Sequence, residues 1–378
     1  MATSSSVNNP YILFTPGPLT TSRTVKEKML NDVGSRDTVF IDLVSDIRHR
    51  LVELAHGNPD TYTAIFIQGS GTFGLESVIS STVAPDGKIL IAVNGAYGRR
   101  LVQIAEALHI NVVSIEYGED QPVTPEDIGN ALDKDSQITH VGVCHCETTS
   151  GILNPIQKIG HYVKSAQKIY FVDAMSSLGG IPVNITEWDI DYLVSSANKC
   201  IEGVPGFSFI LAKLSTLLNT EGYARSVSLD LLAQYKGLEK NGQFRFTPPT
   251  HTLLAFHQAL LELEEEGGVL SRMARYQKNH EILMTGMREL GFQPYLKPDN
   301  QGPIITSFYY PNHPNFSFDT FYRRLQNCGH VIYPGKVGNA DCFRIGTIGR
   351  IFPFHIRGLL DAIRKVLGEM DVQLKTKE

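Results

Sequence analysis

Short apolar runs alternate with stretches of helix-like pattern from about residue 63 to residue 211. The runs have the length of buried strands, and they are expected at 64–67, 89–93, 141–144, 169–172 and 192–194. Such alternation predicts a mostly parallel sheet with helices on both faces. A further strand is expected at 209–212, and it can be antiparallel to the others.

The pattern changes after this region. A long helical pattern at 253–266 ends at Gly267 and Gly268, and its three consecutive glutamates are expected on a solvated face. Apolar runs at 304–308 and 342–345 predict strands with helices between and after them. This second pattern indicates a smaller α+β domain.

The predicted fold class is therefore α/β, with a large domain built on a mostly parallel sheet and a smaller C-terminal α+β domain. Its expected bounds are an N-terminal arm at 1–20, the large domain at 21–266 and the small domain at 267–378.

Two polar residues follow apolar runs at positions that can face one ligand. Asp173 ends the run at 169–172, and Lys199 lies in the loop after 192–194. Ligands of such sheets gather at the carboxyl ends of the strands. An amine that forms a Schiff base and a carboxylate for the pyridine nitrogen are what pyridoxal phosphate requires. Taken singly, Lys199 is typical of a solvated charge and Asp173 of a turn residue or helix N-cap.

Residues 68–74 form a glycine-rich turn between a predicted strand and a helical pattern that begins at Leu75. Free backbone N–H groups and the helix dipole bind phosphate at such a turn, where Ser70 and Thr72 add hydroxyl donors. The glycines also fit the dinucleotide fingerprint, but the next strand ends at Asn94 without the acidic residue that binds a ribose. We therefore interpret the turn as a phosphate cradle without a dinucleotide.

Tyr97 and Arg344 are further candidates for ligand contact. Tyr97 lies between glycines after a predicted strand, where its ring can lie flat against a ligand ring or pack beneath a turn. Arg344 lies inside an apolar strand, where a buried cation needs a partner. That partner is either an internal carboxylate or a substrate anion, which the planar guanidinium grips through two oxygens.

Composition narrows the possible functions. A net charge of −5 argues against nonspecific nucleic-acid binding. No apolar run approaches the roughly 18 residues of a membrane span. Residues 1–6 lack the pattern of a signal peptide and are expected to form a frayed tail. The five cysteines lack framework spacing, which suits a reducing cytoplasm. Cys144, His145 and Cys146 suggest a metal, but no second cluster supplies the other ligands, so none is expected.

Several segments resemble those of the class V aminotransferases, which are pyridoxal-phosphate enzymes of fold type I. The resemblance runs nearly end to end and is closest to the 2-aminoethylphosphonate–pyruvate transaminase family. The segments at 199–207 and 248–251 are the most specific to that family. The matching segments lie at 14–18, 68–72, 146–152, 172–177, 198–207, 245–251 and 343–346.

The resemblance implies a seven-stranded sheet, pyridoxal phosphate as the cofactor, and a homodimer with shared active sites. Lys199 would bond covalently to the cofactor, Asp173 would pair with its ring nitrogen, and Arg344 would grip the substrate anion. Thr247 of one subunit would reach the cofactor phosphate of the other. The remaining cofactor contacts implied are Ser70, Gly71, Thr72, Tyr97, Thr148 and Asn198. Glu202, beside the lysine segment, departs from the family pattern outside these roles.

The expected reaction moves the amino group of 2-aminoethylphosphonate to pyruvate and gives phosphonoacetaldehyde and L-alanine. The nearest alternative is a transaminase of the alanine–glyoxylate or serine–pyruvate type, which would share the cofactor residues and differ in its donor. A cysteine desulfurase would need a mobile cysteine, whereas Cys328 ends a helical pattern and Cys342 lies in a predicted strand. A non-catalytic binding protein would have no use for the lysine–aspartate pair.

Overall fold

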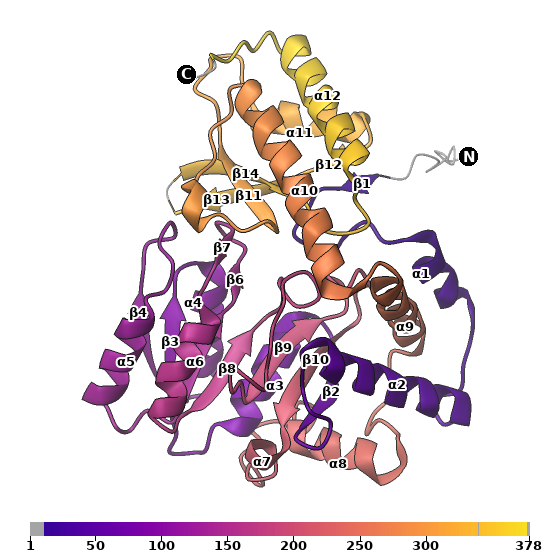
Figure 1. Cartoon of the computed structure of the whole chain (residues 1–378), viewed down its shortest axis with the longest axis vertical. Coiled ribbons are helices and arrows are strands. Elements are labelled where there is room, and N and C mark those ends of the chain that lie inside the picture. Colours follow the sequence, from indigo (N-terminus) through magenta and orange to yellow (C-terminus); the bar gives the residue numbers. More distant parts are fainter. Residues whose placement is uncertain (1–10, 339, 376–378) are drawn as a thin grey trace.

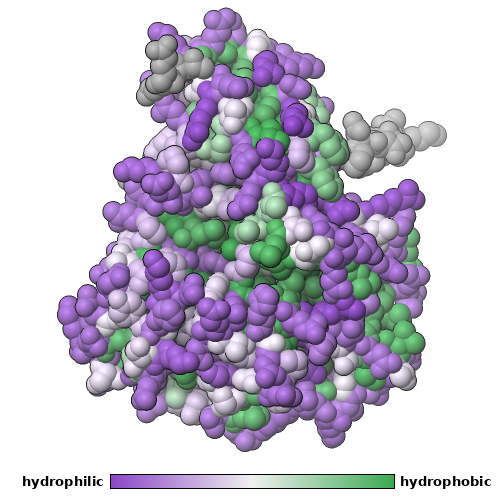
Figure 2. Space-filling view, viewed as in Figure 1, coloured by the Kyte–Doolittle hydropathy of each residue, from purple (hydrophilic) through white to green (hydrophobic). Residues whose placement is uncertain are grey.

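The structure, a computed structural model, describes residues 11–338 and 340–375, so the tail expected at 1–6 lies outside it. Figure 1 shows a larger lower part around a seven-stranded sheet and a smaller upper part around a three-stranded sheet. On the face shown in Figure 2, hydrophobic residues gather where the two parts meet. The domain bounds at 20/21 and 266/267 stay a prediction. No helix in the described ranges is long and apolar enough to cross a membrane.

The large sheet is mostly parallel, as predicted. In spatial order its strands are β2 (Tyr62–Gln68), β10 (Phe207–Lys213), β9 (Tyr192–Ser196), β8 (Ile169–Asp173), β5 (His140–Cys144), β3 (Lys88–Val93) and β4 (Asn111–Glu116). Only β10 runs antiparallel to its neighbours, β2 and β9, among the strands described. The carboxyl ends of the other strands therefore lie along one edge of the sheet.

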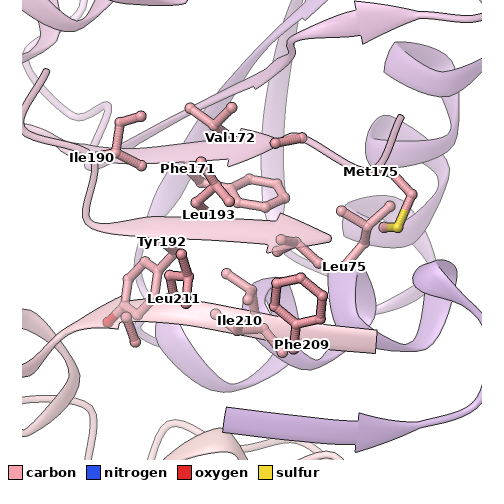
Figure 3. Close-up of a cluster of buried hydrophobic side chains, with 14 of the residues drawn as sticks. Leu75, Phe171, Val172, Met175, Ile190, Tyr192, Leu193, Phe209, Ile210 and Leu211 are labelled. Atoms are coloured by element: carbon pink, nitrogen blue, oxygen red, sulfur yellow. The ribbon is translucent and has the colours of Figure 1, made fainter. Parts of the chain in front are cut away.

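The inner strands are buried along nearly their whole length because helices flank the sheet. The helices of this part are α1 (Arg23–Glu27), α2 (Thr38–Leu54), α3 (Gly71–Thr82), α4 (Ala96–Ala107), α5 (Pro125–Lys134), α6 (Ile156–Ser165), α7 (Leu214–Leu217), α8 (Leu231–Asn241) and α9 (Thr250–Glu265), with a short 3₁₀ helix η1 (Lys28–Leu30). Figure 3 shows Phe171, Leu193 and Ile210 from three adjacent strands in one cluster with Leu75 of α3. Burial of each such side chain contributes about 1.5–3 kcal/mol, which holds the strand ends in fixed positions.

Two local expectations differ from the structure. Helix α3 begins at Gly71, before the expected start at Leu75, because Ser70 takes the N-cap position. Glu264 and Glu265 are exposed at the end of α9, as expected, but Glu266 is largely buried and pairs with arginines of the next helix. The solvated-face prediction is therefore wrong for Glu266.

The smaller part contains a second hydrophobic core. Its antiparallel sheet has the order β11 (Ile305–Tyr309), β14 (Ala340–Gly346) and β13 (Tyr333–Val337). Its helices are α10 (Gly268–Glu289), η2 (Pro298–Asn300), α11 (Phe318–Asn327) and α12 (Pro353–Glu369). Two small pairings complete the fold: β1 (Ile12–Leu13) with β12 (His330–Val331), and β6 (Cys146–Glu147) with β7 (Ile152–Leu153). Because Phe14 packs into this second core, the N-terminal segment is anchored to the smaller part.

Candidate active site

The carboxyl edge of the large sheet brings Asp173 and Lys199 together. Asp173 is the last residue of β8, and Lys199 follows β9 in the loop that leads to β10. Asp173 pairs with Cys144 of β5 and with Val194 of β9 in the sheet register. The acid and the lysine are therefore held on neighbouring strand ends, as the apolar pattern predicted.

Lys199 is enclosed by the N-terminal segment. Its ammonium Nζ donates a hydrogen bond of 2.6 Å to the Pro16 carbonyl. Gly17 has φ +123°, and a Cβ added there would lie 2.6 Å from that Nζ atom. Burial lowers the pKa of Lys199; Arg344 acts in the same direction, while Cys200 and Asp173 oppose it. The amine is therefore more readily deprotonated than an exposed lysine, as a base or nucleophile requires.

Asp173 is 1% exposed, and its Oδ1 accepts a 2.9 Å hydrogen bond from the Met175 N–H. Burial raises the pKa of Asp173 to about 6; Glu147 adds to the rise, while Arg100 and Lys199 oppose it. A cation placed beside this carboxylate would favour its ionised form. The site therefore suits a ligand that carries a positive charge at this point.

The glycine-rich turn supplies the start of α3. Ser70 is the N-cap, and its hydroxyl makes no capping hydrogen bond. A Cβ at Gly71 would overlap the sulfur of Met175, so the start of α3 lies in close contact with the segment after Asp173. The N–H groups at the start of the helix and the Ser70 and Thr72 hydroxyls form a donor set that suits a phosphate.

Tyr97 lies in the first turn of α4, which begins directly after the carboxyl end of β3. The guanidinium carbon of Arg100 lies 4.9 Å from the centre of its ring. Burial raises the pKa of the Tyr97 hydroxyl, while the nearby Thr148 hydroxyl, Arg344 and Arg100 lower it. Thr148 is fully buried, and Asn198 is partly exposed directly before Lys199.

Several buried polar atoms near this edge have no hydrogen-bond partner of normal geometry among the described residues. Leaving such an atom unpaired costs about 1–3 kcal/mol, so those at this edge are available to a polar ligand. Together with an amine, a carboxylate and a helix N-terminus, they fit a phosphorylated pyridine. These atoms are His145 Nδ1, Thr148 Oγ1, Ser150 Oγ, Ser196 Oγ and Arg344 Nε.

Arg344 reaches the same region from β14. Its Nη1 donates to the Thr148 carbonyl at 3.0 Å, and its Nη2 donates to the Pro334 carbonyl at 3.2 Å. Its guanidinium carbon also lies 4.8 Å from the centre of the Tyr333 ring. No carboxylate forms an ion pair with it in the described part of the chain, so the internal salt bridge left open by the sequence is not found there. The carbonyls orient the guanidinium without neutralising its charge.

Thr247 lies apart from these side chains, in an exposed position before α9. Its carbonyl accepts a hydrogen bond from the side chain of Gln68, the last residue of β2. This contact fastens the segment before α9 to the strand that carries the phosphate turn. The contact of Thr247 with a second subunit stays a prediction.

The sequence did not predict a network of ion pairs that contacts the lysine loop, the segment 197–206 between β9 and β10. Arg272 is 0% exposed; it donates to the Cys200 carbonyl at 3.0 Å and pairs with Glu266 at 2.8 Å. Arg275 pairs with Glu202 at 2.7 Å and with Glu266 at 2.6 Å. Glu202 therefore helps to fix the lysine loop to α10, and its charge beside an apolar segment was the available signal.

The chain is similar to known aminotransferases in sequence and in fold. The family described as aminotransferase class-V matches residues 22–324. A 2-aminoethylphosphonate–pyruvate transaminase of Bacillus cytotoxicus is 52% identical over 94% of this chain and 98% of its own length. One of Vibrio vulnificus is 51% identical over 96% of this chain and 99% of its own length.

A crystal structure of ureidoglycine–glyoxylate aminotransferase from Bacillus subtilis has the same fold. It superposes with a TM-score of 0.88 over 97% of this chain and 95% of that one, at 24% identity. The family match and the two close relatives cover most of the chain, including the lysine loop and the aspartate strand. The chain belongs to the class V aminotransferase family.

Proposed function

We propose that this chain is a transaminase that uses pyridoxal phosphate to move the amino group of 2-aminoethylphosphonate to pyruvate. The products are phosphonoacetaldehyde and L-alanine, and the reaction serves phosphonate degradation. The observation that carries the proposal is the placement of Lys199 and Asp173 on neighbouring strand ends. The names of relatives at about 50% identity support the choice of substrates.

Bound through Lys199, the cofactor supplies an electron sink for the negative charge that forms when a proton leaves the carbon bearing nitrogen. Asp173 would hold the proton on the ring nitrogen through its buried carboxylate. Tyr97 would lie against the ring, and Thr148 and Asn198 would contact its hydroxyl side. The phosphate would be held by Ser70, Gly71 and Thr72.

Lys199 would also move the proton. When Lys199 is not bonded to the cofactor, its amine would be free to take up the proton that leaves the carbon bearing nitrogen. The lowered pKa leaves more of that amine in the neutral form that accepts a proton. The Pro16 carbonyl, which accepts the Lys199 hydrogen bond at 2.6 Å, would hold the released ammonium in place. The enclosing segment would also keep water from the proton in transit.

Arg344 would bind the anionic end of each substrate. Its guanidinium keeps its positive charge while two N–H groups are used by carbonyls, and its Nε is buried without a partner in the described residues. A planar guanidinium can bind the oxygens of a phosphonate or of a carboxylate in pairs. One arginine would thus serve the donor in one half-reaction and the acceptor in the other.

A transaminase of the alanine–glyoxylate or serine–pyruvate type is the rival, and the close relatives do not favour it. We further propose a homodimer in a reducing cytoplasm. Phe73 and Phe246 are about half exposed beside the phosphate turn and Thr247, as expected for a surface that a second subunit covers. The cysteines are all free, as a reducing compartment requires.

The test compares Arg344→Lys and Arg344→Ala with the unchanged protein, using 2-aminoethylphosphonate, L-alanine, L-serine and L-aspartate as donors. We expect kcat/KM for the phosphonate to fall at least about tenfold in Arg344→Lys, which keeps the charge but loses the fork, and further in Arg344→Ala. Unchanged kinetics in Arg344→Lys would refute the anion clamp. Faster transfer from alanine or serine to glyoxylate than from the phosphonate to pyruvate would favour the rival transaminase.

A further inference from the structure

Glu147 is a buried acid to which the proposed reaction gives no part. Its side chain is 0% exposed, and no ion pair joins it to a cation in the described ranges. Burial raises the pKa of Glu147, against hydrogen bonds that favour the ionised form. Because a buried carboxylate without a counter-ion is costly, those hydrogen bonds have to hold it.

The bonds lead to the start of α4. Glu147 Oε2 accepts from the N–H groups of Tyr97 at 3.2 Å and Gly98 at 3.1 Å. Its Oε1 accepts from the N–H of Thr149 at 3.1 Å and from the Thr149 hydroxyl at 2.6 Å. The same hydroxyl accepts from the Ala96 N–H at 3.0 Å. Glu147 and Thr149 together therefore bind the first three N–H groups of the helix.

This remote cap replaces a local one. The N-cap of α4 is Gly95, which has no side chain to cap the helix. A Cβ at this position would overlap the carboxyl group of Glu147, so a side chain there would displace the carboxylate that caps the helix. The first-turn N–H groups need an acceptor, and a carboxylate there also interacts favourably with the helix dipole.

The segment at 147–149 also contacts the smaller part of the molecule. The Thr148 carbonyl accepts from Arg344 Nη1 at 3.0 Å, and the Thr149 carbonyl accepts from the Ser307 hydroxyl at 3.2 Å. The side chains of this segment thus contact α4, the helix that carries Tyr97, and its carbonyls contact β11 and β14.

We infer that Glu147 is a positioning residue. Its carboxylate acts with the Thr149 hydroxyl to hold Tyr97 against the cofactor ring, at a fixed position relative to Arg344. The role of Tyr97 at the ring rests on the proposed function. The capping of α4 does not rest on the proposed function, because the hydrogen bonds that cap the helix lie within the protein. Loss of Glu147 should therefore weaken cofactor binding and lower kcat even though neither substrate nor cofactor needs to contact it.

The test uses Glu147→Gln and Thr149→Val, which remove an acceptor and a hydroxyl with little change of shape. Thr149→Ser restores the hydroxyl, and Glu126→Gln makes the same chemical change at an exposed position in the first turn of α5. Hydrogen exchange of the peptide covering 94–101 is measured in the cofactor-free protein. Pyridoxal phosphate dissociation, the visible circular dichroism of the bound cofactor, and kcat and KM for 2-aminoethylphosphonate are then measured.

We expect Glu147→Gln and Thr149→Val to speed exchange at 96–98 and to weaken cofactor binding, each by about tenfold. The visible dichroism should fall, and kcat should fall more than KM changes, while Thr149→Ser and Glu126→Gln behave like the unchanged protein. Normal exchange, dichroism and cofactor affinity in Thr149→Val would overturn the inference even if Glu147→Gln did not fold. Faster exchange with an unaltered dichroism and kcat would also overturn it, since the cap would then be structural only. An unchanged protein that binds the cofactor but ignores 2-aminoethylphosphonate would refute the proposed substrate and leave the exchange and dichroism tests standing.

Discussion

Replacing Asp173 with asparagine should make the cofactor-free protein more stable at neutral and alkaline pH, although it should damage the active site. Asparagine keeps the shape of the side chain, and its oxygen can still accept the 2.9 Å hydrogen bond from the Met175 N–H. The substitution therefore removes a buried charge with little change in the shape of the side chain.

The pKa of Asp173 sets the magnitude. It is raised from 3.8 to about 6 by burial, so the folded chain binds this proton more tightly than the unfolded chain does. Ionisation of Asp173 therefore lowers the free energy of unfolding. The loss is absent at low pH, where Asp173 is protonated, and it grows as the pH rises from the pKa of the unfolded chain to that of the folded chain. By linkage the loss is about 2 kcal/mol at pH 5 and about 3 kcal/mol at pH 8.

Urea unfolding of the cofactor-free proteins at pH 5 and pH 8 measures the difference. Buried histidines such as His140 and His145, with pKa values lowered to about 4, affect both proteins equally and cancel. The advantage of Asp173→Asn should grow by about 1 kcal/mol between the two pH values. A difference that is independent of pH, or that shrinks toward pH 8, would refute the reasoning. With the cofactor bound the order should reverse, because the carboxylate then has its cation.

Three further changes test other parts of the account. Gly17→Ala should slow cofactor attachment at Lys199 at least about tenfold, because the new Cβ meets Nζ and φ is unfavourable; unchanged absorbance kinetics on cofactor addition would contradict this. Arg272→Met should lower the free energy of unfolding in urea by about 3–5 kcal/mol, because two largely buried glutamates would share one remaining arginine; an unchanged midpoint and slope would argue against the network. Mixing Lys199→Ala with Thr247→Ala protomers should restore part of the activity, and no recovery after demonstrated subunit exchange would count against a shared site.

The central strands could be predicted because they are buried on both sides, which leaves an uninterrupted apolar run in the sequence. Strand β4 was not predicted, since it lies at the edge of the sheet and contains only exposed and partly buried residues. Strand β13 contains Pro334 and Gly335, which argue against a strand except at an edge, and it occupies the edge of its sheet.

The site likewise contains residues that the sequence predicts and contacts that it does not. Asp173 and Lys199 were visible because each follows an apolar run, and parallel topology brings strand ends together. The Lys199–Pro16 hydrogen bond joins residues 183 positions apart, and no periodicity in the sequence relates the two. Glu147 lies inside a recognised segment, but its capping bonds to α4 depend on how β6 and α4 pack. Contacts of this kind follow from tertiary packing and not from local pattern.

An internal competition assay tests the central claim most directly. The unchanged protein, supplied with pyridoxal phosphate and pyruvate, is given equal concentrations of 2-aminoethylphosphonate, L-serine and L-aspartate, and the loss of each donor is followed with the formation of alanine. The account predicts that 2-aminoethylphosphonate is consumed with a kcat/KM at least about a hundredfold above the others, with one phosphonoacetaldehyde formed per alanine. Preferential consumption of serine or aspartate, or alanine formed without phosphonoacetaldehyde, would contradict it.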